Sequence, residues 1–301
     1  MTLRQEMHQA ARLAPDLLGG HRDAVAAFLR SHQTPDGGFR GRAEQSDLYY
    51  TVFALDGLAA LEADFSRDAA ARYLASFAGG EELDLVHLAC LARCWAALDC
   101  GLRIADCGSR NREWRETLLG RIETHRSADG GYAPTPGAEH GTAYACFLAL
   151  GAVEDLGATV EQPEGIIRCL SSLRRGDGGI ANECGLRAGS TPATAAALTI
   201  LHHLGGPTDD AARDWLLARV HPQGGFAATA AAPVPDLLST GTALHALAGI
   251  GAPLAHLRAP CLDFVEGLWA DEGGFRGTWL DDAPDAEYTF YALLALGHLA
   301  Q

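Results

Sequence analysis

His87, Cys90 and Cys94 are side chains of the types that bind metal ions. They stand at positions i, i+3 and i+7, so a helix would bring all three to one face, with Asp84 one turn earlier. An imidazole and two thiolates form a ligand set that zinc accepts. The surrounding residues are mostly Ala and Leu, however, and cysteine in such a helix is commonly a small apolar core residue. We therefore expect these side chains to pack in a helical core and predict no metal site.

Three arginines follow Gly-Gly-Phe sequences, and their guanidinium groups could together hold an anionic small molecule. They are Arg40, Arg42 and Arg276. Acidic residues stand near them in the chain, and we favour surface ion pairs with Glu44, Asp47 and Asp281. The 301 residues carry a formal net charge of -15, with a pI near 5.1. Nucleic acids and anionic membranes need a basic face, so we exclude both as partners.

Six glycine pairs divide the chain into repeats that would position these side chains. The pairs are Gly37-Gly38, Gly79-Gly80, Gly130-Gly131, Gly178-Gly179, Gly224-Gly225 and Gly273-Gly274. A period of 20 to 50 residues is typical of stacked supersecondary units. Most of the pairs follow Asp, Glu or Gln and precede an aromatic residue. Glycine accepts positive φ and Asp bonds to nearby backbone, so each pair is predicted to end one helix and lead to the next.

The helices on the two sides of each glycine pair differ in polarity. Upstream segments such as 23–30, 115–122 and 215–220 mix apolar residues with Arg, Asp and Glu. Downstream segments such as 51–61 and 289–296 are apolar nearly all round, which is typical of a buried helix. The fold class is therefore predicted to be all-α, a closed ring of six inner and six outer helices around a central cavity. Residues 1–301 would form this single domain.

Bulk properties favour a soluble cytoplasmic protein. Residues 1–9 are polar rather than signal-like, and no apolar stretch is long enough to span a membrane. The cysteines lack the spacing of a secreted scaffold, so we expect thiols rather than disulfides. The eight cysteines are Cys90, Cys94, Cys100, Cys107, Cys146, Cys169, Cys184 and Cys261.

The first and last repeats carry a resemblance to a known family. Gly37-Gly-Phe-Arg-Gly-Arg42 leads to an apolar segment that begins at Asp47, and Gly273-Gly-Phe-Arg-Gly277 leads to one that begins at Asp285. These repeats resemble those of protein prenyltransferase β subunits and of class II terpene cyclases such as the squalene-hopene cyclases. The resemblance covers about residues 20 to 300. It implies an α/α toroid whose inner helices enclose a pocket for an isoprenoid or a prenyl diphosphate.

The prenyltransferase resemblance implies sites that this chain only partly retains. That family binds catalytic zinc through an Asp-x-Cys and a His, where this chain has Asp236-Leu-Leu238 and Tyr288. Leu cannot bind zinc, so we expect no zinc, while magnesium stays open as a cofactor. The diphosphate-binding Arg and Lys are also absent after Phe226. The resemblance leaves Asp236 and His140 as candidate substrate contacts, with a packed or loop-bonded role as the alternative for His140. Arg42 stays a candidate substrate contact because its guanidinium could bind an anion.

The cyclase resemblance implies an acid in the last repeat. The Asp-x-Asp-Asp-Thr motif of those enzymes corresponds to Asp285-Ala-Glu-Tyr-Thr289, so Glu287 stands where their proton donor would be. A carboxylic acid in an apolar pocket can have its pKa raised enough to protonate an alkene. Asp285 and Tyr288 would hold its geometry. The alternative for Asp285 is a helix N-cap, the usual role of Asp at a helix start.

Aromatic residues of the inner segments could line the pocket and stabilise a carbocation through their π faces, or could be plain core. The candidates are Tyr49, Tyr50, Tyr144 and Tyr291, together with Phe53 and Phe290. We align the repeats at the Thr that opens each inner segment, with Leu88 in the second repeat and no clean match in the fourth. The aligned residues are Thr51, Thr142, Thr240 and Thr289.

The leading functional hypothesis is an isoprenoid-handling enzyme that works without zinc and starts cyclisation with a proton from Glu287. Alternatives are prenyl transfer from a prenyl diphosphate and a non-catalytic toroid that binds a lipid or peptide. The toroidal lanthionine cyclases are the least favoured, because their Cys-His-Gly zinc motif is missing. A lone toroid lacks the second domain of typical class II cyclases and the α subunit of prenyltransferases. A partner subunit or a stand-alone enzyme is therefore expected.

Overall fold

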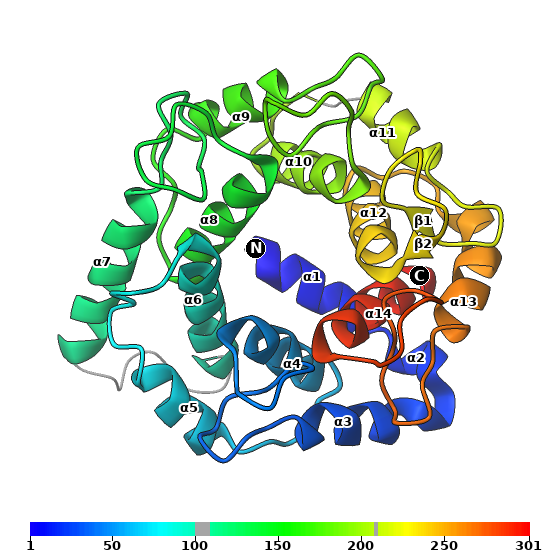
Figure 1. Cartoon of the computed structure of the whole chain (residues 1–301), viewed down its shortest axis with the longest axis horizontal. Coiled ribbons are helices and arrows are strands. Elements are labelled where there is room, and N and C mark those ends of the chain that lie inside the picture. The colour runs from blue at the N-terminus through cyan, green and yellow to red at the C-terminus, as the bar shows by residue number, and fades with distance from the viewer. Residues whose placement is uncertain (100–108, 208–209) are drawn as a thin grey trace.

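The computed structural model describes residues 1–99, 109–207 and 210–301, and it has the form of a closed helical ring (Figure 1). The inner helices are α4 (Leu48–Ala60), α6 (Leu85–Asp99), α8 (Ala143–Asp155), α10 (Thr191–His203), α12 (Leu237–Gly249) and α14 (Ala286–Leu299). The outer helices are α3 (Arg22–Ser31), α5 (Arg67–Ala75), α7 (Ser109–Glu123), α9 (Pro163–Ser172), α11 (Asp210–Leu217) and α13 (Arg258–Glu266). The predicted all-α toroid with six inner and six outer helices is confirmed.

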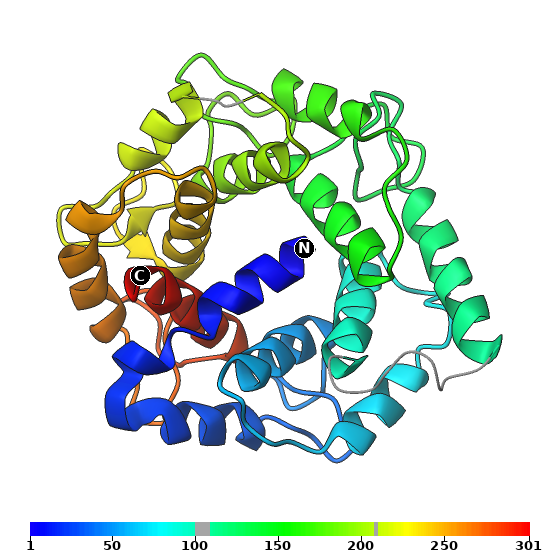
Figure 2. The ribbon, with the colours of Figure 1, turned by 180° about the vertical axis from the view of Figure 1, so that it is seen from behind.

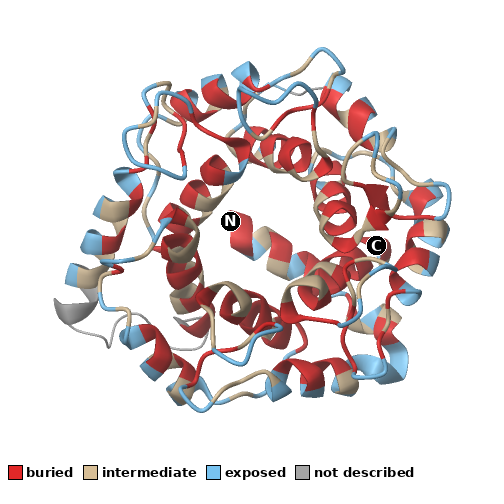
Figure 3. Ribbon diagram, in the orientation of Figure 1, coloured by how far each residue is buried: buried red, intermediate tan, exposed pale blue. Residues whose placement is uncertain are grey.

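Burial follows the predicted difference between the two rings (Figure 3). The inner helix α4 has no charged residue except Asp56, and most of its side chains are buried. The outer helix α9 instead buries one stripe, formed by Ile166, Cys169 and Leu170. The hydrophobic core therefore lies between the two rings of helices. None of the described helices is long and apolar enough to cross a membrane.

The glycine pairs follow the outer helices, as predicted, and two of them show why glycine is required. Gly37 has φ +100°, and a Cβ there would lie 2.0 Å from the carbonyl oxygen of Ala69 in α5. A Cβ on Gly224 would lie 1.8 Å from the carbonyl oxygen of Pro260 in α13. Each of these turns packs directly on the backbone of the next outer helix, so a side chain there would separate the repeats.

A recurring hydrogen bond ties the turn to its inner helix in five of the six repeats. The backbone N–H that follows the glycine pair donates to a side chain in the first turns of that helix, and we call the accepting side chain the register residue. The Phe275 amide donates to Thr289 Oγ1 at 3.1 Å, and the Phe226 amide to Thr240 Oγ1 at 2.9 Å. The same bond joins Phe39 to Thr51 and Ile180 to Thr194.

The register bond corrects the sequence alignment in the middle of the chain. In the third repeat the Tyr132 amide donates to Cys146 Sγ at 3.3 Å, whereas Thr142 caps α8 by accepting from the Ala145 amide. The prediction that Thr142 aligns with Thr289 was therefore wrong by four residues. A Thr that caps a helix and a Thr that accepts the register bond cannot be told apart in the sequence. In the third repeat the register bond is accepted by Cys146, so an alignment based on Thr residues missed it.

Neighbouring repeats are joined where the inner helices begin. The first amides of α8, α10 and α12 donate to carbonyl oxygens in the loop of the following repeat, over 2.8 to 2.9 Å. The donor and acceptor pairs are Ala143 and Asn182, Thr191 and Ala228, and Leu237 and Gly277. Between the last and first repeats, Arg42 Nε instead contacts the carboxylate of Asp285 at 3.3 Å. This ion pair links the two ends of the ring.

A helix outside the repeats occupies one end of the ring. Helix α1 (Leu3–Ala11) contacts α14, α4 and α8, and it lies across the inner ring when the molecule is seen from behind (Figure 2). Its Leu3 amide donates to Glu154 near the end of α8, at 3.0 Å. The sequence prediction treated residues 1–9 only as a polar terminus. The capping box of Thr2 and Gln5 was the missed helix signal.

The remaining elements are short. Helix α2 (Pro15–Leu18) connects α1 to the ring, and β1 (Phe226–Ala227) pairs antiparallel with β2 (Pro235–Asp236). Helix α11 ends at Leu217, so the predicted helical segment 215–220 extends too far. The six described cysteines are free thiols, as predicted, while Cys100 and Cys107 lie outside the described residues.

Replacing Thr289 with Val should lower the free energy of unfolding by about 1–3 kcal/mol, because the buried Phe275 amide loses its acceptor. Urea denaturation of the full chain would measure the change. Thr117→Val provides the control, since that hydroxyl bonds to the Glu113 carbonyl on the exposed face of α7. Equal effects of the two substitutions would contradict a special role for the register bond.

Candidate active site

The inner helices enclose a cavity of about 430 Å³. Three layers of side chains form most of its wall. They stand two positions before, two after and five after the register residue, counted from Leu88 in α6, and these positions share one helix face. The first of these layers lies at the starts of the helices and contains Tyr49, Tyr144, Pro192, Leu238 and Glu287. The second contains Phe53, Cys90, Leu148, Ala196, Thr242 and Tyr291. The third contains Arg93, Gly151, Thr199 and His245.

Glu287 is the acid of the first layer. Its Oε1 accepts a hydrogen bond of 2.7 Å from Tyr49 Oη, which reaches it across the junction between α14 and α4. Burial raises the pKa of Glu287 to about 7, and the nearby charge of Asp285 acts in the same direction. The bond from Tyr49 opposes this shift, because it favours the ionised carboxylate. A substantial fraction of Glu287 is therefore protonated near neutral pH.

Aromatic rings surround this acid. Tyr49 and Phe53 lie with ring centroids 5.1 Å apart, and Phe53 and Tyr291 lie 5.5 Å apart. Tyr144 completes the first layer from α8. Burial raises the pKa of Tyr49 and of Tyr144 above the ordinary value for tyrosine, so both phenols stay neutral. Of the predicted substrate contacts, Tyr49, Tyr144 and Tyr291 line the same cavity as Glu287.

Asp285 and the other two predicted tyrosines lie outside the cavity lining. Asp285 is the N-cap of α14 and accepts from the Tyr288 amide at 2.9 Å, which agrees with the capping interpretation. Burial raises the pKa of Asp285, and the Arg42 guanidinium opposes this effect. Tyr288 and Tyr50 instead cover glycines of the preceding turns. A Cβ on Gly277 or Gly41 would come within 2.4 Å of these rings.

Arg42, Asp236 and His140 have other local partners. Arg42 pairs with Asp285 and, at 3.8 Å, with Asp281, one of the predicted acidic partners. Asp236 caps α12 by accepting from the amide and the hydroxyl of Ser239. His140 is 59% exposed and lies 3.7 Å from Asp129. None of these three lines the cavity.

The residues at the corresponding zinc positions do not fit a zinc site. Asp236 is committed to its cap, Leu238 is an apolar part of the cavity wall, and Tyr288 packs on Gly277. In the parts of the chain that the structure describes, no three His, Cys, Asp or Glu side chains converge as metal ligands.

The His87, Cys90 and Cys94 group separates in the structure. His87 Nδ1 lies 2.7 Å from the carboxylate of Asp84, while Cys94 is fully buried in the core. Burial raises the pKa of Cys90 to about 12 and that of Cys94 well above its ordinary value, so both remain thiols. Cys90 contributes only a small apolar surface to the second layer.

A charged cluster at the deep end of the cavity was not predicted from the sequence. Arg93 Nε contacts Asp56 at 2.6 Å, and Arg4 of α1 contacts Asp155 at 3.0 Å. Burial raises the pKa of Asp155 to about 6, although the neighbouring Arg4 favours its charged form. Asp56 and Arg93 are isolated charges within apolar inner segments, and this was the available sequence signal, since buried charges must be paired.

Two histidines also meet at this depth. His245 Nδ1 and His298 Nε2 lie 3.0 Å apart, and His245 lines the third layer. Burial lowers the pKa of His245 to about 3 and that of His298 to about 4. Both imidazoles are therefore neutral at physiological pH and are able to accept a proton from a strong acid.

Comparison with family models identifies the family. The model of the prenyltransferase alpha-alpha toroid domain matches residues 9–165, 81–205, 145–227 and 193–301. These segments together cover nearly the whole chain, which therefore belongs to this family. A comparison with curated proteins gave no match.

Solved structures show how widely the fold is used. The type II terpene cyclase MstE from Scytonema, in complex with geranylgeranyl dihydroxybenzoate, is 15% identical with a TM-score of 0.63, covering 99% of this chain and 98% of that chain. An alpha-1,6-mannanase from Salegentibacter is 13% identical with a TM-score of 0.63, covering 94% and 98%. Protein geranylgeranyltransferase-I of Candida albicans, complexed with GGPP, is 14% identical with a TM-score of 0.53, covering 97% and 82%. These similarities establish the toroid fold, whereas the reaction must be inferred from the residues of the cavity.

Replacing Glu287 with Gln should stabilise the protein most at high pH. The folded-state pKa of about 7 exceeds the ordinary 4.5, so the wild type loses stability as the pH rises from about 4.5 to about 7, where the unfolded chain has released a proton that the half-buried Glu287 still holds. Between pH 5 and pH 8 the variant should gain about 2–3 kcal/mol relative to the wild type. Urea denaturation at several pH values would measure this. Glu139→Gln, on an exposed loop, controls for the lost charge, and a pH-independent difference would contradict the burial effect.

Proposed function

We propose that this protein is an isoprenoid-handling enzyme that cyclises a prenyl chain by proton transfer in the central cavity. The observation that carries the proposal is Glu287, a half-buried carboxylic acid on the cavity wall, held by Tyr49 and flanked by aromatic rings. Such an acid can deliver a proton into an apolar space where the substrate displaces water. The activity, its substrate class and its residues are all part of this proposal.

The proposed reaction begins with the protonated oxygen of Glu287. Because Oε1 accepts from Tyr49, the proton is best placed on Oε2, from which it passes to an alkene carbon of the substrate. The resulting carbocation is attacked by the π electrons of the next double bond, which forms a ring bond and moves the positive charge along the chain. The rings of Phe53, Tyr144 and Tyr291 stabilise that charge through their π faces.

The reaction ends when the last carbocation loses a proton and forms a new double bond. His245 is a neutral base in the third layer, and its Nε2 is the ring nitrogen that His298 does not contact. One proton enters from Glu287 and one leaves to His245, so the reaction is an isomerisation. Return of that proton to Glu287 through solvent after product release would restore the enzyme.

The family membership and two of the structural likenesses support an isoprenoid ligand. MstE holds a geranylgeranyl compound described as its substrate, and another structure of MstE holds merosterolic acid A, described as its product. The matched MstE chain has nearly the same extent as this chain. Zinc-dependent prenyl transfer is less favoured, because the residues at the zinc positions do not fit the metal.

Glu287→Gln should reduce cyclisation by at least about 100-fold, because the amide cannot donate the required proton. Purified protein would be incubated with geranyl, farnesyl and geranylgeranyl diphosphates and with geranylgeranyl dihydroxybenzoate, with and without magnesium and zinc. Mass spectrometry would follow the products. In D₂O the product should gain one deuterium, and wild-type activity should fall as the pH rises through about 7.

Glu139→Gln again serves as the control and should retain activity. Retention of a ligand without any product would favour a non-catalytic binding toroid. Release of pyrophosphate with transfer of the prenyl group would favour a transferase. Full activity of Glu287→Gln would show that another group donates the proton.

Tyr49→Phe should move the high-pH limb of the activity profile upward by about one pH unit. Tyr49 donates a hydrogen bond that stabilises the ionised form of Glu287, so its loss raises the pKa of this acid further. The maximal rate should also fall, because the carboxyl group loses its orientation. A slower enzyme with an unmoved pH limb would argue that Tyr49 only packs against its neighbours.

A further inference from the structure

We propose that helix α1 is the floor of the cavity and that Leu3 and Met7 set the length of the prenyl chain that fits. This inference rests on the proposed function, because it concerns the substrate of the same cavity. Leu3, Arg4 and Met7 all line the cavity, although α1 belongs to none of the six repeats.

The position of α1 along the ring makes it a floor. The cavity wall runs along α8 from Tyr144, two positions before the register residue, to Asp155, nine positions after it. Eleven helical residues correspond to a depth of about 16 Å. The deep end of this wall is where α1 attaches, through Arg4 to Asp155 and through the Leu3 amide to Glu154.

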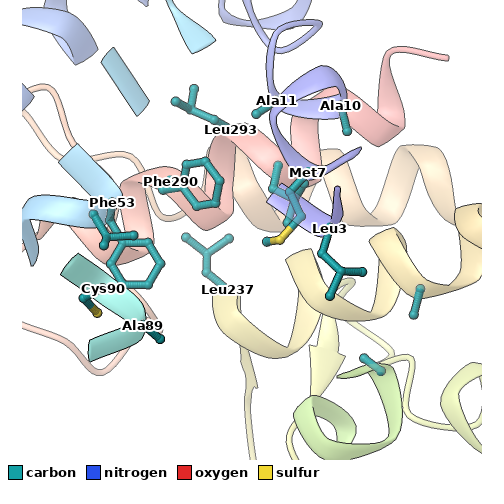
Figure 4. Close-up of a cluster of buried hydrophobic side chains, with 14 of the residues drawn as sticks. Leu3, Met7, Ala10, Ala11, Phe53, Ala89, Cys90, Leu237, Phe290 and Leu293 are labelled. Atoms are coloured by element: carbon teal, nitrogen blue, oxygen red, sulfur yellow. The ribbon is translucent and has the colours of Figure 1, made fainter. Parts of the chain in front are cut away.

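The side chains of α1 are the bulky apolar groups at this depth. The inner helices contribute the small residues Gly151, Ala152 and Thr199 there, beside the polar side chains of Arg93, Asp155 and His245. Leu3 and Met7 are one helical turn apart and leave α1 on the same side (Figure 4). Both are almost completely buried, with 2% and 4% exposure. A prenyl chain that enters from the mouth therefore ends against these two side chains.

Helix α1 is firmly held by the ring. The depth of the cavity is therefore set by the side chains of α1 and not by a movement of this helix. Arg4 is 7% exposed and pairs with Asp155 at 3.0 Å. A Cβ on Gly297 of α14 would lie 1.8 Å from the carbonyl oxygen of Ala10, which shows how closely α1 packs on the ring. His203 adds a bridge between α1 and α8, with Nδ1 3.1 Å from Glu6 and Nε2 2.5 Å from Glu154.

Met7 is the better of the two positions for a test. Met7→Ala removes the γ carbon, the sulfur and the terminal methyl group, which deepens the cavity without touching the ion pairs of α1. Met7→Phe fills the same region with a rigid ring and shortens the cavity. Both substitutions leave Glu287 and its aromatic neighbours in place, so chain length changes while the proposed acid is retained.

The experiment measures dissociation constants of the full chain for geranyl, farnesyl, geranylgeranyl and geranylfarnesyl diphosphates. We expect Met7→Ala to shift the affinity ratio by about tenfold or more toward the chain one isoprene unit longer than the wild type prefers, since several additional apolar groups become buried. Met7→Phe should shift the ratio toward the shorter chain. Leu74→Ala is the matched control, because this fully buried residue of α5 lies outside the cavity.

Thermal denaturation would establish that each variant folds. The proposal that α1 is the floor would be supported if the affinity ratio shifts in opposite directions in the two Met7 variants and stays unchanged in Leu74→Ala. An unchanged ratio in folded Met7 variants would overturn this inference and leave the proposed function standing. A wild-type protein that binds none of the four chains nor geranylgeranyl dihydroxybenzoate would overturn both.

Discussion

In five of the six repeats, the hydrogen bond from the amide after the glycine pair to the register residue determines which face of the inner helix meets the cavity. The turn is itself fixed on the next outer helix, so this bond sets the rotation of the inner helix relative to the whole ring. Thr289 thereby places Glu287 and Tyr291 on the cavity wall and turns Asp285 and Tyr288 away from it. The Thr289 hydroxyl group therefore fixes the rotation of α14, and this rotation decides that Glu287 faces the cavity while Asp285 caps the helix.

The repeat pattern was sufficient to predict the ring, because glycine pairs and helix polarity are local properties of the sequence. It also allowed Glu287 to be predicted as a cavity residue, because Thr289 aligns the last repeat with the cyclase motif without ambiguity. It failed for Thr142, where the acceptor had changed to Cys146. It could not separate Tyr49 from Tyr50, because adjacent residues on an apolar helix look alike until the register is known. Tyr49 lines the cavity, whereas Tyr50 covers Gly41.

The features that sequence reasoning missed depend on contacts between distant segments. The ion pair of Arg93 with Asp56 joins α6 to α4, and that of Arg4 with Asp155 joins α1 to α8. Burial of each charge alone would cost desolvation free energy, and the oppositely charged partner on the other helix offsets that cost. The partner cannot be identified from one helix by itself. The pairs also confine permanent charge to the deep end of the cavity. Aromatic rings line the region beside Glu287, and they would suit the proposed cationic intermediate.

The contact between Tyr49 and Glu287 has a consequence for how the ring becomes functional. Tyr49 lies on the first inner helix and Glu287 on the last, so the pair forms only when the two ends of the toroid meet. Before closure, the carboxyl group would be hydrated and would have the acidity of an ordinary glutamate. The proposed proton donor thus depends on topology as well as on sequence, because the chain acquires this unusual acid only when the ring closes.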